Sequence, residues 1–117
     1  MIEDLVSHVF AMRNAAHLAH FSTKSFSEHK ALGKLYDDLI DKIDGIVEAY
    51  QGYYGLIGEV RIMMMPKDRI ADLIRTELGW IQTNREKIAK KNTMIENLID
   101  DLMQTYSTAH YKLVNLK

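Results

Sequence analysis

The sequence contains no cysteine, and this absence narrows the chemistry open to the protein. Disulfide bonds, thiolate metal sites and thiol catalysis are excluded, so any bound metal must be held by nitrogen and oxygen ligands. No apolar run approaches the roughly 20 residues of a membrane-spanning helix. The acidic start Met-Ile-Glu-Asp is unlike a signal peptide. We therefore expect a soluble, cytoplasmic protein that does not enter a membrane.

An excess of charge of either sign is also lacking. The 15 Lys and Arg residues are balanced by 16 Asp and Glu residues, which gives a net charge of −1. A nearly neutral chain without a basic tail has no general attraction to nucleic acid. A small basic patch falls near the end of a predicted helix, where cations interact favourably with the helix dipole. The patch consists of Arg85, Lys87, Lys90 and Lys91. We therefore expect no nucleic-acid partner.

Strand patterns are absent, and four segments instead repeat apolar residues at the helical period. The segments expected to be helical are 2–21, 26–51, 66–90 and 93–115. A chain of 117 residues can build one proper core, so we expect a single domain over 1–117. The glycine-rich stretch QGYYGLIGEV and a run of three methionines form a longer connection after the second segment. The pattern predicts an all-α, ferritin-like four-helix bundle with a longer crossover between helices 2 and 3.

Local signals set the expected helix ends. Ser25 and Thr93 each precede a glutamate by three residues, as in a capping box. Pro66 suits the first turn of the third helix, because no amide donor is needed at that position. Gly52 and Gly55 are expected to stop the second helix.

A row of carboxylates follows one side of the second predicted helix. Its members are Asp37, Asp41, Asp44 and Glu48, spaced i, i+4, i+7 and i+11. On an ideal helix they fall within a sector of about 60°. Like charges this close repel one another by a few tenths of a kcal/mol per pair. The row is therefore either a solvated acidic face or the binding place of a cation.

The histidines lie at the other end of the same hairpin. His29 and Asp44 are 15 residues apart, or about 22 Å along a continuous helix. His20 precedes the turn and should lie near His29, whereas His8 and His17 fit the first helix as core residues. One chain cannot close a metal site from both groups. Two copies packed antiparallel about a two-fold axis could, because residue i of one copy then meets residue j of the other.

The run AHFSTKSFSEHKALGKLYDDLIDKIDGIVE resembles the signature of the Dps-type (DNA protection during starvation) branch of the ferritin-like superfamily. His20 and His29 match its two histidines, and Tyr36 matches its tyrosine. Asp44 and Glu48 match its closing carboxylates. The resemblance implies an iron-oxidising, ferroxidase-type site shared between two subunits. The metal ligands that it implies are His20, His29, Asp44 and Glu48. The strings TKSFSEHKAL and YQGYYG also resemble small ferritin-like proteins of tailed bacteriophages.

Two departures from the signature bear on that site. The loop between the histidines is shorter than in the family, so His17, which restores the longer spacing to His29, is an alternative to His20 as first ligand. The family has a further aspartate one turn after the second histidine, where this chain has Gly33. One carboxylate ligand is therefore missing. A glycine inside a helix also indicates the close approach of another helix or a ligand.

The leading hypothesis is an iron-binding, ferritin-like protein that forms at least a dimer and could close into a larger shell. Zinc or manganese would suit the same imidazole and carboxylate ligands. The alternative is a non-enzymatic bundle with a degenerate site that acts as an assembly or accessory protein, which the glycine at position 33 favours. A nucleic-acid compactor, as some Dps proteins are, is disfavoured by the neutral charge.

Overall fold

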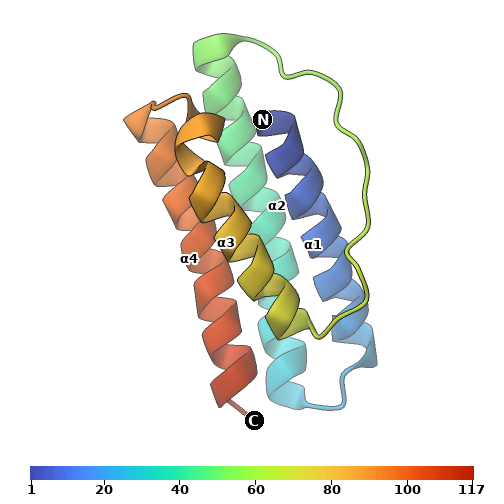
Figure 1. The fold of residues 1–117 in the computed structure, drawn as a ribbon. Coiled ribbons are helices and arrows are strands. Elements are labelled where there is room, and N and C mark those ends of the chain that lie inside the picture. Colours follow the sequence, from blue (N-terminus) through green and yellow to red (C-terminus); the bar gives the residue numbers. More distant parts are fainter.

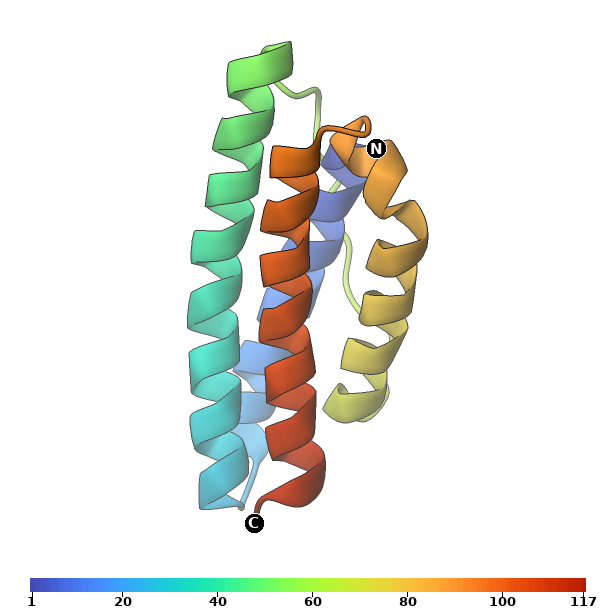
Figure 2. The same ribbon diagram turned by 90° about the vertical axis from the view of Figure 1, so that its left-hand side faces the viewer.

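The computed structural model describes residues 1–117 and contains four helices and no strand. They are α1 (Ile2–Ser22), α2 (Phe26–Tyr54), α3 (Ile70–Ala89) and α4 (Thr93–Asn115). Each helix packs against two others, in the cyclic order α1, α2, α4, α3 (Figures 1 and 2). Residues 55–69 cross the bundle between the diagonally placed α2 and α3. The predicted all-α four-helix bundle with its longer crossover is confirmed.

The core is made by the apolar stripes that the helical period predicted. Along α2 the buried stripe is Leu32, Leu35, Leu39, Ile43, Ile46 and Tyr50. On α4 it is Ile95, Ile99, Leu102, Tyr106 and Ala109. These residues join the buried faces of α1 and α3 in a single cluster. Full burial of each large aliphatic side chain contributes about 1.5 to 3 kcal/mol, so this cluster makes the largest contribution to the stability of the bundle.

Two of the predicted helix ends and one predicted cap are wrong, whereas the predicted range of the fourth helix, 93–115, is confirmed. The second helix continues through Gly52 and ends at Gly55, whose φ of 87° is a conformation that glycine adopts without strain. Pro66 lies in the crossover, and α3 begins only at Ile70, where side chains start to face the core. The cap of α4 is Asn92 rather than Thr93: the side-chain oxygen of Asn92 accepts from the backbone N–H groups of Met94 and Ile95.

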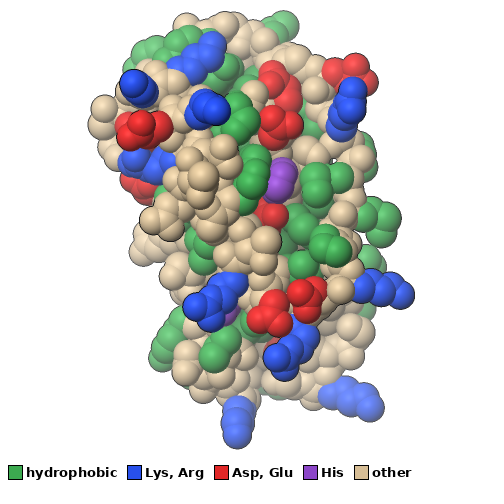
Figure 3. Space-filling view, in the orientation of Figure 1, with side chains coloured by type: hydrophobic (Ala, Val, Ile, Leu, Met, Phe, Trp, Pro, Cys, Tyr) green, Lys and Arg blue, Asp and Glu red, His purple; other side chains and the backbone are tan.

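The crossover follows the outside of α1 and is held mainly by side chains. Residues 56–68 make no backbone–backbone hydrogen bond. Instead, the amide of Gly58 donates to the Glu3 carboxylate at 2.7 Å, and the Ser7 hydroxyl donates to the carbonyl of Arg61. Figure 3 shows apolar side chains exposed on this face. In the crossover, the side chains of Ile62 and Met64 are exposed. No helix of the chain combines the length and apolarity needed to cross a membrane.

Candidate metal site

The two predicted histidine ligands lie side by side where α1 turns into α2. His20 is in the last turn of α1, and His29 is in the first turn of α2. Nδ1 of His20 lies 2.8 Å from the carbonyl oxygen of His29, and Nδ1 of His29 lies 2.9 Å from the carbonyl oxygen of His20. The rings stack with centroids 3.7 Å apart and 19° between their planes. We call this reciprocal arrangement the histidine clasp.

The clasp determines which ring nitrogen carries the proton. A carbonyl oxygen only accepts hydrogen bonds, so Nδ1 of each ring must be the donor. The neutral rings therefore carry their lone pairs on Nε2, which neither of these hydrogen bonds uses. Metal-binding histidines usually donate their other ring N–H to a carbonyl or carboxylate, which fixes the tautomer and the ring orientation. The clasp thus has the hydrogen bonding that two metal-binding imidazoles require.

The short turn between the two helices positions the clasp. The Ser25 hydroxyl accepts from the amide of Glu28 at 3.2 Å and so caps α2, as the sequence predicted. In a full capping box the Glu28 side chain would accept from the amide of Ser25. Here that amide donates to the Thr23 hydroxyl at 3.1 Å instead. Local polar contacts therefore fix where α2 starts, and with it the position of His29.

His17, the alternative first ligand, faces a different partner. Its ring stacks on Tyr36 with centroids 4.0 Å apart and lies 6.2 Å from the ring of His20. It is therefore His20, not His17, that contacts His29. Gly33 leaves space for this arrangement, because a Cβ atom there would lie 3.2 Å from Cε1 of His20. The close approach that this glycine indicated is made by the imidazole ring.

The two predicted carboxylate ligands lie elsewhere in the chain. Asp44 and Glu48 are exposed on α2, with Asp44 15 residues, or about 22 Å along the helix, from His29. No group of three or more His, Cys, Asp or Glu side chains in the chain could hold a metal ion. A single copy therefore brings together the two histidines but not the histidines and the carboxylates.

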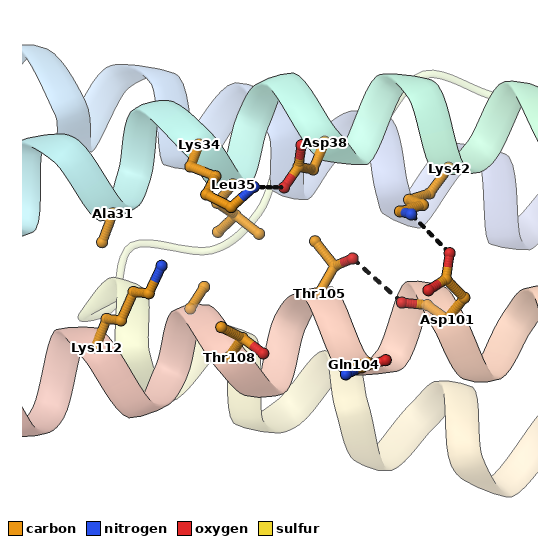
Figure 4. Close-up of a pocket in the computed structure, with 11 residues that line it drawn as sticks. Ala31, Lys34, Leu35, Asp38, Lys42, Asp101, Gln104, Thr105, Thr108 and Lys112 are labelled. Atoms are coloured by element: carbon orange, nitrogen blue, oxygen red, sulfur yellow. Dashed lines mark hydrogen bonds and ion pairs between the residues drawn. The ribbon is translucent and has the colours of Figure 1, made fainter.

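The outer side of α2 differs from the side that faces α4. In the groove between these helices, Lys34 pairs with Asp38 at 3.0 Å and Lys42 with Asp101 at 2.6 Å (Figure 4). The carboxylates of the outer side are all exposed and form no ion pair. They are Asp37, Asp41, Asp44 and Glu48, and we call them the acidic row. In one copy the row is an exposed acidic face without ion pairs, and only the charge of Asp41 helps to raise the pKa of a lysine, Lys42.

A second histidine site lies inside the bundle, between α1 and α3. Nδ1 of His8 lies 3.0 Å from each carboxylate oxygen of Glu77, and its ring stacks on Trp80 with centroids 3.7 Å apart. Glu77 is only 3% exposed, and burial raises the pKa of its carboxyl group, an effect that His8 opposes. The hydroxyl of Tyr106 is also buried and has no hydrogen-bond partner. Burial and the charge of Glu77 raise the pKa of Tyr106 well above its usual value.

The sequence carried a signal for this buried pair that periodicity alone did not use. Glu77 lies three residues after Ile74 and four before Ile81, both fully buried, so it occupies the middle of the apolar stripe of α3. A charged residue at such a position is buried only when it is paired. The expectation that His8 is a core residue was correct in kind, although its carboxylate partner was missed.

Comparison with known proteins gives one family and one distant relative. The profile of a family described as "Family of unknown function (DUF5856)" matches residues 20–113. An uncharacterized 14.6 kDa protein in the mobD-ri intergenic region of Enterobacteria phage T4 is 49% identical over 39 residues. That match covers 33% of this chain and 30% of the phage protein. No solved structure matches. The resemblance to phage proteins is thus supported, whereas the resemblance to Dps proteins is not.

Proposed function

The chain belongs to the DUF5856 family, whose function is unknown, and we propose from its geometry that it binds a metal ion as a two-fold dimer. In this proposal His20 and His29 of one copy face Asp44 and Glu48 of the other. The histidine clasp carries the proposal, because it commits both Nδ1 protons to backbone carbonyls and leaves both Nε2 atoms for a ligand. Iron is the proposed metal, and zinc or manganese would suit the same ligands.

The surroundings of the clasp support a site that a second molecule completes. The Phe21 side chain is 71% exposed although its ring lies only 4.8 Å from that of His17 and 6.0 Å from that of His20. Leu18, one turn earlier on α1, and Phe26, at the start of α2, are also exposed. Apolar side chains grouped beside polar ones are typical of surfaces that contact another protein. The acidic row supplies the missing ligands without giving up any existing ion pair.

The proposed register has a consequence for assembly. When His29 of one copy lies opposite Asp44 and Glu48 of the other, the two-fold axis passes near Asp37, midway between them. The Asp37 side chains of the two copies then meet near the axis, where their like charges repel, and each metal site gathers two further carboxylates. We therefore propose that the dimer forms only when a cation is bound. The four ligands and the glycine at position 33 favour metal binding over ferroxidase activity as the primary role; bound ferrous iron would add redox chemistry with oxygen or peroxide.

The test is the mass in solution with and without metal. Sedimentation equilibrium under anaerobic conditions should give a monomer in chelator and a dimer after addition of ferrous iron. Zinc provides a redox-inert comparison with the same preference for imidazole and carboxylate. A chain that remains monomeric, with no metal retained after desalting, would contradict the proposal.

A second candidate function is that of a non-enzymatic assembly or accessory protein. One observation favours it: a groove of about 1110 Å³ lies between the second half of α1, the end of the crossover and the start of α3. Met63–Met65 line this groove together with Leu18 and Phe21, and flexible methionine side chains adapt well to a protein partner. This function is the one that remains if the metal-dependent mass change is not observed.

A further inference from the structure

The end of the bundle opposite the histidine clasp joins tyrosines and lysines that are far apart in the sequence. Tyr53 and Tyr54 end α2, whereas Lys87, Lys90 and Lys91 surround the turn between α3 and α4. Nζ of Lys90 lies 4.6 Å from the ring centroid of Tyr54, whose ring is 5.9 Å from that of Tyr53. Lys90 thus joins the two tyrosines to the lysines of the turn, and we call these five residues the tyrosine–lysine surface. In Figure 3 the Lys and Arg side chains over this turn lie at the upper left, with Asp and Glu side chains between some of them.

Two of the lysines in this turn have a left-handed backbone conformation. Lys90 has a φ of 53° and Lys91 a φ of 59°. The amide of Lys91 donates to the carbonyl of Glu86, five residues earlier, in the pattern that glycine usually supplies at a helix end. Left-handed conformations are unfavourable for residues with a Cβ atom. The helix dipole does not require this strain, because Lys87 already places a cation in the last turn of α3.

The surface is also free to bind a ligand. Tyr53 is 56% exposed and Tyr54 40% exposed. Lys87, Lys90 and Lys91 are exposed and form no ion pair. The neighbouring Arg85, by contrast, is neutralised by Asp100 and Glu96. The acids nearest in sequence are Glu48, Glu59, Glu86 and Glu96; the first three are exposed, and Glu96 pairs with Arg85. None of them forms an ion pair with the three lysines, whose ammonium groups are therefore available to an anionic ligand.

We propose that the tyrosine–lysine surface binds single-stranded nucleic acid. Unpaired bases would stack on the rings of Tyr53 and Tyr54, and the phosphodiester backbone would contact Lys87, Lys90 and Lys91. Exposed aromatic rings beside cations are the combination that binds single strands without reading sequence, since every base has a face that can stack. A duplex keeps its bases inside and would use only the lysines. The net charge of −1 bears on long-range attraction, not on this local contact.

Glycine substitution separates binding from folding at this turn. The double variant Lys90→Gly and Lys91→Gly removes two phosphate contacts while relieving the left-handed strain. We expect its melting temperature to equal or exceed that of the wild type by a few degrees, and its affinity for a labelled oligothymidine of about 20 nucleotides to fall by at least tenfold. The slope of log K against log salt should become shallower by about 1.4, since each phosphate contact contributes about 0.7 on a single strand. Fluorescence anisotropy at about 50 mM salt and upward measures both quantities.

A charge-matched variant and an aromatic variant complete the test. Lys24→Gln with Lys112→Gln removes the same two charges elsewhere, and the affinity should change less than about twofold. Tyr53→Leu should weaken binding by about fivefold or more without changing the salt dependence, because it removes a stacking face and no charge. Parallel titrations with oligouridine show whether RNA or DNA is preferred, and binding of either one supports the proposal.

Several results would overturn this proposal. One is a wild-type chain that fails to bind either oligonucleotide at low salt. Another is a glycine variant that binds as well as the wild type. Tighter binding of a duplex than of the single strand would show that the tyrosines are not used. Equally effective competition by polyglutamate would mean that the surface recognises acidic protein rather than stacked bases.

Discussion

The two histidine pairings of this chain differ in what their imidazoles have left to bind. His20 and His29 give their Nδ1 protons to main-chain carbonyls at one end of the bundle, close to the surface. His8 points between α1 and α3, where its Nδ1 meets the buried carboxylate of Glu77. The first pair leaves its Nε2 nitrogens outside these hydrogen bonds, beside the exposed Phe21 side chain. The second pair compensates a polar group within the core.

This difference shows that the partner of a histidine, more than its exposure, decides its role. A main-chain carbonyl carries no charge, so its hydrogen bond orients the imidazole ring and leaves the second ring nitrogen available to bind a metal. A buried carboxylate has no solvent to stabilise its charge, so its imidazole partner becomes part of the stability of the fold. Substitutions should therefore affect stability at one site and metal binding at the other.

Removing His8 should produce the largest change in stability. His8→Ala leaves the Glu77 carboxylate buried without its partner, and we expect the free energy of unfolding at pH 7 to fall by about 3 kcal/mol. Urea denaturation measures this loss, and His110→Ala, whose ring makes no hydrogen bond, is the control. Metal-dependent dimerisation of the folded variant should be unchanged. A loss below about 1 kcal/mol would show that the pair is not important for stability.

The same pair should respond to pH. Burial raises the folded-state pKa of Glu77 above its ordinary value of 4.5. Between these two values the folded protein binds more protons than the unfolded chain, so the stability contribution of this group falls as the pH rises through that window. The cost of His8→Ala should therefore shrink as the pH is lowered through that window, because a growing fraction of Glu77 is then protonated in the folded state.

Removing one ligand of the proposed metal site should affect binding more than stability. Either His29→Ala or Glu48→Gln should weaken metal binding by at least about 100-fold and abolish the metal-dependent dimer, while unfolding free energy changes by less than about 1 kcal/mol. Glu59→Gln removes an exposed carboxylate from the crossover and serves as the control. Calorimetric titration with zinc gives the affinity. Wild-type binding by either ligand variant would argue against the shared site.

Mixing two inactive chains tests whether the site is shared. A dimer of one His29→Ala chain and one Glu48→Ala chain has one site that lacks both groups and one that is intact. Because neither variant dimerises alone, metal should favour the mixed dimer, and up to about half of all sites should return. Metal retained after desalting of the mixture measures the recovery. A mixture in which no sites return would mean that each copy supplies its ligands differently.

The sequence was sufficient for the parts of the molecule that depend on local periodicity. The buried stripe of α2 and the capping serine at Ser25 follow from spacing alone, because period and cap chemistry act within a few residues. Pro66 misled the prediction of α3, since a proline that is compatible with a helix start does not require one. The helix begins four residues later, at Ile70, the first residue of this segment that packs against the core.

The sites needed information that spacing does not contain. The proximity of His20 and His29 could be predicted because the turn between them is short. The pairing of His8 with Glu77 joins residues 69 positions apart, and that of Tyr54 with Lys90 depends on how two helix ends meet. The resemblance to Dps proteins matched individual residues, but the structure puts an imidazole ring against Gly33, where that signature has a carboxylate.

Gly33 should have a moderate effect that links the clasp to the proposed site. In Gly33→Ala the added Cβ would lie 3.2 Å from Cε1 of His20, closer than the ring tolerates without moving. We expect metal affinity to fall by about tenfold, which is about 1.4 kcal/mol. Stability should change little, because alanine favours the helix by up to about 1 kcal/mol and so offsets the displacement. Imidazole resonances of His20 should shift by NMR, whereas Gly45→Ala, which meets nothing, should leave them in place.

The smallest expected effect tests the other member of the buried polar group. The Tyr106 hydroxyl is buried without a hydrogen-bond partner, and its ring is fully enclosed. Tyr106→Phe keeps the ring and removes only the unsatisfied oxygen, so the variant should be as stable as the wild type or more stable by about 1 kcal/mol. Because Glu77 already interacts with His8, this change should leave the pH response of stability in place. Denaturation at two pH values measures both points, and a loss of more than about 1 kcal/mol would show that the hydroxyl has a partner, such as a buried water, that stabilises the core.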